Sequence, residues 1–563
     1  MKRDRPRRSS GSATIGDALS SSVKGQLHQL RETLEKLAKE TIARQLDEAR
    51  PWRRPQTGTA IRKAKTRPSP SVSQRSVTST RQLPRQVNPT HRVKPKAPEM
   101  HKPAPKPSKP AFEYWDFPKE LAVREAPPTS ISDAERAEFE DLIQADAQSR
   151  SAEGEDLFII AGLDFGTSCT KIIIRLPYEA GEPAIAIPAP APCHSGDNPY
   201  LWQTVLWLQE DGSFLPWPSA DATVLHALKQ GLIQGRSDAE TSGTRSANRA
   251  TRAQAGVAYL AFAIRYVRGW LFRNRPDLLR GRRPVWFVNL GMPTASYDDP
   301  QLAKPYRRIG AAALQLAKIE SPISIEAAQC FLDESHVIEA GASEEVAEEL
   351  GVAVFPEAAA EMTGFVKSTR NAPGLYLLVD VGAMTLDACM FRLNPGTDMS
   401  YVYSFLNAQV RPLGVESFHW FLGEGKTESE FIQQCDRTLR GVVWQARRDR
   451  DPNAQNWKSG HDVPVFLAGG GASNGLHQGI VASLGPWLTH HLGNDGIRLL
   501  ELPVPSAIEF PVPLEDFGRM AVAWGLSHLP TDIGRIRAMR DIEDVPPPVP
   551  VDWSGRYVSK DQV

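Results

Sequence analysis

The 563-residue chain has little cysteine, no net charge and no long hydrophobic run. Its five cysteines are scattered and never form a CxxC pair, which argues against a disulfide framework and against a zinc site. The longest apolar stretch, near residues 255–264, is about half of the ~20 residues that a membrane-spanning helix needs. No apolar segment follows the basic N-terminus, so no secretory leader is expected. These absences predict a soluble, cytoplasmic protein that has no membrane partner.

The zero net charge conceals an uneven distribution, because residues 1–110 carry about +18 and the remainder about −18. Residues 1–14 are basic and Ser-rich, which predicts disorder. Over residues 15–50 apolar side chains recur at steps of three and four, which predicts an amphipathic helix. Residues 51–111 are rich in Pro, Lys, Arg and Ser and have few apolar side chains, so they read as a basic linker.

This N-terminal part leaves two questions of partnership open. Its helix either packs on the body or on a copy of itself, or it docks a protein partner together with the basic tail. The linker could attract nucleic acid through charge alone, although it lacks interleaved aromatics and a solvated linker is the simpler interpretation. Residues 112–150 contain the aromatic cluster FEYWDF (112–117) and a helix expected from about Ser132 to Ala147, which together anchor the tail to the body.

The sequence LFIIAGLDFGTSCTKIIIRL (157–176) organises the body. Two Ile-rich runs flank Asp164, Gly166, Thr167 and Ser168, and this arrangement predicts a buried β-hairpin with a polar tip. Glycine lets the backbone approach a ligand closely, the hydroxyls and N–H groups can hold phosphate oxygens, and Lys171 adds a point charge. On this stretch alone, an ordinary tight turn with a solvated Asp fits equally well.

The same pattern returns about 215 residues later. Leu375–Val379 and Leu386–Leu393 are apolar runs that flank a tip containing Asp380, Gly382 and Thr385. Two such hairpins suggest a duplicated domain whose tips face one ligand.

A third glycine-rich turn contains Gly469, Gly470 and Gly471, between a predicted strand (463–468) and a predicted helix (475–490). A strand that runs through glycines into a helix allows close contact with a flat ligand or a phosphate. By itself this turn could equally be dehydrogenase-like or reflect close packing.

Apolar runs and amphipathic stretches indicate the remaining elements. We expect a further hairpin from 201–208 and 214–217, helices over 258–272, 300–318, 344–350 and 514–529, and strands over 284–290 and 352–355.

The three glycine-containing sites, in this order, resemble the nucleotide-binding fold shared by actin, sugar kinases and the seventy-kilodalton heat-shock chaperones. Three further segments are similar to the chaperone branch: LGVESF (413–418), PEAAA (356–360) and AVAWG (521–525). The resemblance implies an α/β fold, a duplicated ribonuclease-H-like (actin-like) two-lobed ATPase domain. It implies lobe I at 151–372, lobe II at 373–512, a closing helix at 513–531 that packs on lobe I, and a C-terminal tail at 532–563.

The resemblance also implies ATP and Mg²⁺ as ligands. Asp164 and Asp380 would hold Mg²⁺ through its waters, and Asp380 and Glu357 are candidates for orienting the attacking water. The implied nucleotide contacts are Gly166, Thr167, Ser168, Lys171, Gly382, Thr385, Gly469, Gly470 and Gly471.

The sequence departs from the family pattern at several positions. Ala383 and Met384 stand where the second phosphate loop usually has glycines, and Phe355 replaces the Glu that precedes the linking Pro. The adenine-stacking Arg of the family falls on Ser473, and the sequence does not identify the catalytic Lys of the first lobe. Few residues follow Leu529, so no peptide-binding β-domain is expected.

The function expected from these features is a chaperone-like protein that binds and hydrolyses ATP, with lobe closure as its output. The alternatives are an actin-like filament or scaffold protein and a pseudo-ATPase that binds nucleotide without turnover, the latter motivated by Met384 and Phe355. A sugar-type kinase is disfavoured, because no convincing carboxylate base for a polyol is found.

Overall fold

The computed structural model describes residues 130–150, 153–219, 221–235, 250–320, 322–334, 351–396, 400–505, 508–509 and 517–546. These residues belong to one compact unit, Glu113–Val563. The predictions for 1–14, 15–50, 51–111, 112–117 and 344–350 lie outside the described residues. Among the described helices, none combines the length and the apolar character that crossing a bilayer requires.

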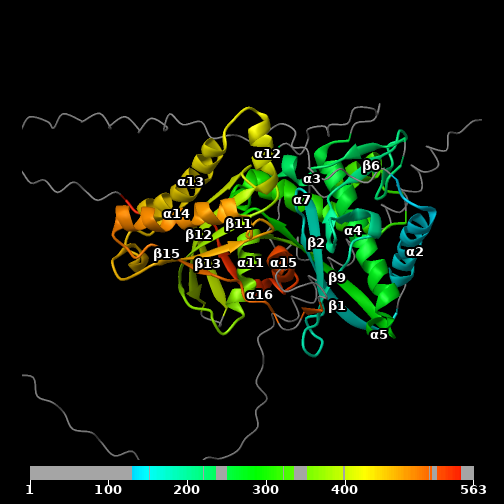
Figure 1. The fold of residues 1–563 in the computed structure, drawn as a ribbon. Coiled ribbons are helices and arrows are strands. Elements are labelled where there is room, and N and C mark those ends of the chain that lie inside the picture. The colour runs from blue at the N-terminus through cyan, green and yellow to red at the C-terminus, as the bar shows by residue number, and fades with distance from the viewer. Residues whose placement is uncertain are drawn as a thin grey trace, which may run out of the picture. The chain divides into compact units, whose positions relative to one another are not determined.

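The described part of the chain is a mixed α/β fold that contains two large sheets and one small one (Figure 1). The first large sheet has the order β10 (Val352–Pro356), β9 (Arg282–Met292), β1 (Glu155–Asp164), β2 (Cys169–Arg175), β3 (Ala184–Ala186) and β16 (Ile508–Glu509). In addition, β5 (Asn198–Gln203) pairs with β2, and β4 (His194–Ser195) pairs with β5. The second has the order β15 (Ile497–Leu500), β14 (Val463–Ala468), β11 (Gly374–Val381), β12 (Leu386–Pro395), β13 (Tyr401–Arg411) and β17 (Arg535–Arg537). The small sheet consists of β6 (Leu206–Leu208), β7 (Phe214–Leu215) and β8 (Thr223–Leu225).

Five strands of each large sheet follow the same order and the same directions. In the first sheet β1 pairs antiparallel with β2 and parallel with β9, while β3 and β10 extend the two sides. In the second sheet β11 pairs antiparallel with β12 and parallel with β14, while β13 and β15 extend the two sides. The two polar tips predicted from the sequence therefore follow β1 and β11, which are the middle strands of these two sets of five.

Helices cover these sheets. Their bounds are α2 (Asp133–Arg150), α3 (Leu228–Leu232), α4 (Arg252–Asn274), α5 (Pro276–Leu279), α6 (Thr294–Asp298), α7 (Pro300–Ala317), α8 (Ile325–Glu334), α11 (Glu357–Val366), α12 (Val415–Gly423), α13 (Glu428–Gln445), α14 (Gly475–Leu492), α15 (Phe517–Leu526) and α16 (Pro530–Ile533). The hydrophobic residues of α13 and α14 form one core with β11 and β12. A buried ion pair between Arg268 of α4 and Asp146 of α2, with Nε and Oδ1 2.6 Å apart, ties α2 to the body.

Helices α11 and α15 lie between the two large sheets (Figure 1). Val522 and Leu526 of α15 share a core with β11 and β12, while Met520 and Ala523 share a core with Ile173 of β2. The two helices touch through their backbones, because a Cβ added to Gly525 would lie 1.8 Å from the carbonyl oxygen of Ala360. This close contact joins the two halves of the unit. We call the part built on the first large sheet the first half and the part built on the second large sheet the second half.

The two polar hairpins, the strand and helix around the glycine triplet, and the strands predicted over 284–290 and 352–355 are all present. The helix predicted from 258 begins six residues earlier, at Arg252, because Thr251 and Gln254 form a capping box there. The helix predicted over 514–529 ends at Leu526, and residues 514–516 lie outside the described part.

Three expectations need correction. The run at 201–208, predicted to be one strand of a hairpin with 214–217, is divided between β5 and β6. Strand β5 pairs with β2, and only the β6 part of the run pairs with β7. Ile508 and Glu509, assigned to lobe II, pair with β3 of the first sheet. The tail expected from 532 contributes β17 to the second sheet, and Ile533 beside it is fully buried, so this segment belongs to the core.

Candidate functional site

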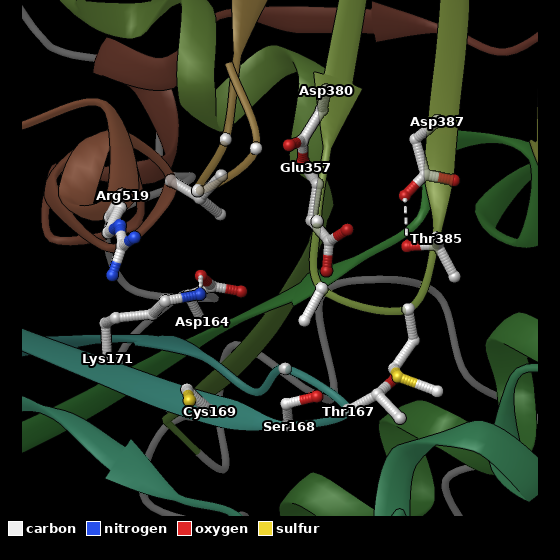
Figure 2. A pocket seen from close by; sticks show the side chains of 18 of the residues that line it. Asp164, Thr167, Ser168, Cys169, Lys171, Glu357, Asp380, Thr385, Asp387 and Arg519 are labelled. Atoms are coloured by element: carbon white, nitrogen blue, oxygen red, sulfur yellow. Dashed lines mark hydrogen bonds and ion pairs between the residues drawn. The ribbon is translucent and has the colours of Figure 1, made fainter. Parts of the chain in front are cut away.

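The three turns predicted to carry chemistry surround one cavity of about 270 Å³. This volume lies just below the ~300–1,000 Å³ typical of small-molecule sites. Figure 2 shows the carboxylates of Asp164, Asp380 and Glu357 turned toward a common space, with Thr167 and Ser168 at one side of it. Residues some 300 positions apart in the chain therefore meet in one cleft.

The first wall of the cleft is the β1–β2 hairpin. Asp164 ends β1, and its register partner on β2 is Lys171, whose Nζ lies 2.8 Å from Asp164 Oδ2. Burial lowers the pKa of Lys171, but the neighbouring Asp164 carboxylate outweighs it and holds this pKa above its ordinary value. The Oγ atom of Ser168 is buried and has no hydrogen-bond partner among the described residues. A hydroxyl in that state has a donor and an acceptor to offer to a ligand.

The second wall is the β11–β12 hairpin, whose tip is held by helix α12. The backbone N–H groups of Gly414, Val415 and Glu416 donate to the carbonyls of Met384, Gly382 and Ala383. These bonds draw the carbonyl oxygens of the tip toward α12, so fewer partial negative charges remain to oppose an anion in the cleft. The Met384 side chain is almost fully buried, so it fills space at the tip that a glycine would leave open.

The glycine triplet forms the third wall, and its first member is fixed by close packing. Gly469 has φ +82°, and a Cβ there would lie 1.9 Å from Asp380 Oδ1. At Gly470 the nearest atom to an added Cβ is Arg519 Nε at 3.5 Å, an ordinary contact distance. Gly469 is thus needed to keep Asp380 where it is, whereas Gly470 leaves room above the turn.

This difference makes a matched pair of variants informative. We expect Gly469→Ala to lower the free energy of unfolding by about 2–4 kcal/mol, because it combines a left-handed backbone with a clash at Asp380. Gly470→Ala should stay within about 0.5 kcal/mol of the wild type. Urea unfolding of both variants is the measurement, and equal losses would contradict the packing described here.

A buried ion pair also lines the cleft. Lys229 of α3 contacts Glu357, the first residue of α11, and both side chains are at least nine-tenths buried. Burial lowers the pKa of Lys229, but Glu357 and Asp164 outweigh it and raise this pKa above its ordinary value. Ala227, which precedes α3, has φ +51°, a strained conformation for a residue with a side chain. The chain thus accepts backbone strain next to the residue that brings a second cation to the site.

Three further carboxyl groups line the same cleft, those of Glu361, Asp387 and Glu416. Glu361 lies one turn along α11 from Glu357, is 2% exposed, and has no hydrogen-bond partner for either carboxylate oxygen among the described residues. Burial and the nearby Asp380 raise the pKa of Glu361 well above its ordinary value. Asp387, the register partner of Asp380, accepts a hydrogen bond from Thr385 Oγ1 at 3.2 Å, and burial and Glu357 raise its pKa as well. The cleft is therefore crowded with acids.

The environment of Asp380 predicts a pH dependence of stability. Burial, Glu357 and Asp164 raise its pKa from 3.8 to about 7. The folded protein consequently binds this proton more tightly than the unfolded chain does, so the contribution to stability is complete at acid pH and is lost as the pH rises toward 7. We expect the free energy of unfolding of the ligand-free protein to fall between pH 5 and pH 7.5, and to fall less in Asp380→Asn. Urea unfolding at both pH values measures this, and identical pH slopes for the two proteins would refute it.

The donor set fits a hydrated Mg²⁺ better than a dehydrated metal. Among the described residues no group of three or more His, Cys, Asp and Glu side chains is arranged to hold a metal directly. Mg²⁺ usually keeps several waters and needs only one or two carboxylates. Asp164 and Asp380, which face one cavity together with the unpartnered Ser168 hydroxyl, meet that requirement.

Every site residue predicted from the sequence lines this cavity. They are Asp164, Gly166, Thr167, Ser168, Lys171, Glu357, Asp380, Gly382, Thr385, Gly469, Gly470 and Gly471. The sequence reasoning missed Lys229, Glu361 and Arg519, which line it too. The only signal for Lys229 is a single Lys within the apolar stretch VLHALKQGLI (224–233).

No protein-family model matches the chain, and no curated protein matches it.

Proposed function

We propose that this protein binds ATP together with Mg²⁺ in the cleft, hydrolyses the ATP, and uses closure of its two halves as its output. The observation that carries the proposal is that two Asp-tipped hairpins and a glycine triplet surround one cavity. We further infer that the two halves are copies of one ribonuclease-H-like unit, as in the actin-like ATPases. The common order and directions of five strands in each large sheet support this inference.

In this proposal different residues bind the metal, contact the phosphates and accept the proton. Mg²⁺, held through its waters by Asp164 and Asp380, would neutralise phosphate charge. Lys171, Thr167 and Ser168 contact the phosphate groups from the first hairpin, and Thr385 contacts them from the second. Phosphoryl transfer depends on such positioning and charge neutralisation more than on covalent chemistry. The Asp380 carboxylate lines the cavity together with Asp164, and in the proposed reaction it orients the attacking water and accepts its proton.

Glu357 has a positioning role in the proposal. It lies against Lys229, so it holds that ammonium group in the wall of the cleft. The glycine triplet would lie under the ribose and the base, where the side-chain-free backbone permits close contact. Ligand contacts from both halves would favour the closed arrangement, which is a shift of population by differential binding.

One observation supports a second candidate, a pseudo-ATPase of the same fold. The buried Met384 occupies part of the loop that would receive the terminal phosphate. In this version the protein binds nucleotide and closes, but releases no phosphate. A heat-shock-chaperone-like role and an actin-like scaffold role both remain compatible with such a cleft, and concentration-dependent sedimentation with ATP would favour the scaffold.

Calorimetric titration of the full chain with ATP tests the proposal. We expect saturable one-to-one binding that requires Mg²⁺ and that weakens by at least about tenfold in Asp164→Asn. Arg370→Ala, which removes an exposed charge from the turn after α11, serves as the matched control and should bind like the wild type. No binding heat for ATP, or binding indifferent to Asp164, would refute the proposal.

A further inference from the structure

Among the residues that the structure describes, three cationic side chains line the cleft, and the protein itself neutralises two of them. Lys171 is paired with Asp164, and Lys229 is paired with Glu357. Arg519 has no ion-pair or hydrogen-bond partner for its guanidinium group among the described residues. Its charge is therefore available to a ligand.

Arg519 also occupies a distinctive place between the two halves. It is the third residue of α15, which shares a core with β2 of the first sheet, while its Nε lies 3.5 Å from the Cβ position of Gly470 beside the second sheet. Its neighbour Gly518 also lines the cavity, and the Arg519 side chain is itself exposed, so the guanidinium is not enclosed. Figure 2 shows the Arg519 side chain directed from α15 toward Lys171 and the first hairpin.

The many carboxyl groups of the cleft oppose the binding of an anion, so an arginine that has no ion-pair partner among the described residues favours it. Asp164, Glu357, Glu361, Asp380, Asp387 and Glu416 all line the cavity, so a phosphate group that enters meets six carboxyl groups. An anionic ligand needs every available cation in such a place, and the planar fork of arginine can donate two parallel hydrogen bonds to one phosphate group. An exposed lysine would supply the charge without the fork.

We propose that Arg519 is a ligand-binding residue of the cleft and that it recognises a phosphate group of the bound nucleotide. This inference rests on the proposed function for the identity of the ligand. It adds that α15, a helix of the first half, contributes directly to phosphate recognition beside the glycine turn of the second half. Recognition of the phosphate chain would then depend on three segments and not only on the two hairpin tips.

The test compares the wild type, Arg519→Ala and Arg519→Lys as full chains, with Arg370→Ala as the control. Calorimetric titrations with adenosine, ADP and ATP in the presence of Mg²⁺, and with inorganic pyrophosphate, separate the base from the phosphates. We expect Arg519→Ala to weaken ADP, ATP and pyrophosphate binding by about 10- to 100-fold and to leave adenosine binding unchanged. The affinity of Arg519→Lys for these ligands should lie between those of the wild type and Arg519→Ala, because lysine keeps the positive charge but cannot donate two parallel hydrogen bonds.

The outcomes separate this inference from the proposed function. If the wild type binds pyrophosphate and loses it in Arg519→Ala, while no protein binds adenosine or ATP, phosphate recognition by Arg519 stands and the nucleotide function fails. If ATP binds equally well to the wild type and to Arg519→Ala, the nucleotide function stands and the role of Arg519 is overturned. Equal weakening of adenosine and ADP would also overturn it, because that result means contact with the base. Arg519 is exposed, so the variants should melt at the wild-type temperature.

Discussion

Lys229→Met is expected to lower the free energy of unfolding by about 3–5 kcal/mol, because it leaves the Glu357 carboxylate buried without its cation. The size of the effect follows from the environment of the pair, since both side chains are at least nine-tenths buried and the carboxyl groups of Asp164 and Asp387 lie nearby. Burial raises the pKa of Glu357, and Lys229 opposes that rise. The loss in Lys229→Met should therefore be smaller at pH 5, where Glu357 can take up a proton, than at pH 8.

The double variant Lys229→Met with Glu357→Leu is the control for this prediction. Replacing both members of a buried pair with apolar side chains of similar volume is often nearly neutral, so much of the lost stability should return. Urea unfolding of the wild type, the two single variants and the double variant gives the coupling energy between the two positions. Additive losses in the double variant would mean that the two side chains do not interact as described.

Asp380→Ala is expected to reduce ATP hydrolysis by about 10²- to 10⁴-fold. The reason is that Asp380 has two roles in the proposed reaction, as a ligand to the waters of Mg²⁺ and as the acceptor of a proton from the attacking water. Phosphate release at saturating ATP measures the effect, and Arg370→Ala should keep the wild-type rate. The variant should also be stable, because it removes a carboxyl group whose burial raises its pKa to about 7.

This prediction also separates the ATPase from the pseudo-ATPase. Phosphate release by the wild type that disappears in Asp380→Ala would exclude the pseudo-ATPase. Release that persists in Asp380→Ala would assign the activity to a contaminant or to another site. Absence of release together with tight ATP binding would favour the pseudo-ATPase, in which Met384 occupies the loop.

The sequence predicts most of the chemical centre because short, strongly patterned segments carry it. Each hairpin needs only two apolar strands and a Gly-containing tip, and both are specified within about 20 residues. Convergence of Asp164 and Asp380 on one cavity is expected from the repetition of the hairpin pattern and from the family resemblance, because the local pattern of a single hairpin carries no information on how distant segments pack. Gly469 is a similar case, since its contact with Asp380 depends on the parallel pairing of β11 with β14.

The residues that the sequence analysis missed are those whose role arises from tertiary packing. Lys229 stands in an apolar stretch without a motif, and only the packing of α3 near α11 brings it to Glu357. Arg519 is one charged residue in an otherwise apolar helix, which is also what a solvated surface position looks like. The strand β17 was missed because Arg535–Arg537 is too short and too polar to give a strand signal, and its pairing with β13 decides its conformation.

The most direct test of the whole account is a crystal structure of the full chain with ADP and Mg²⁺. The account predicts the metal between Asp164 and Asp380 with waters intervening, the base and ribose against Gly469–Gly471, and the phosphates within hydrogen-bond distance of Lys171. Nucleotide bound elsewhere on the molecule, or a cleft without nucleotide at saturating ADP, would contradict it.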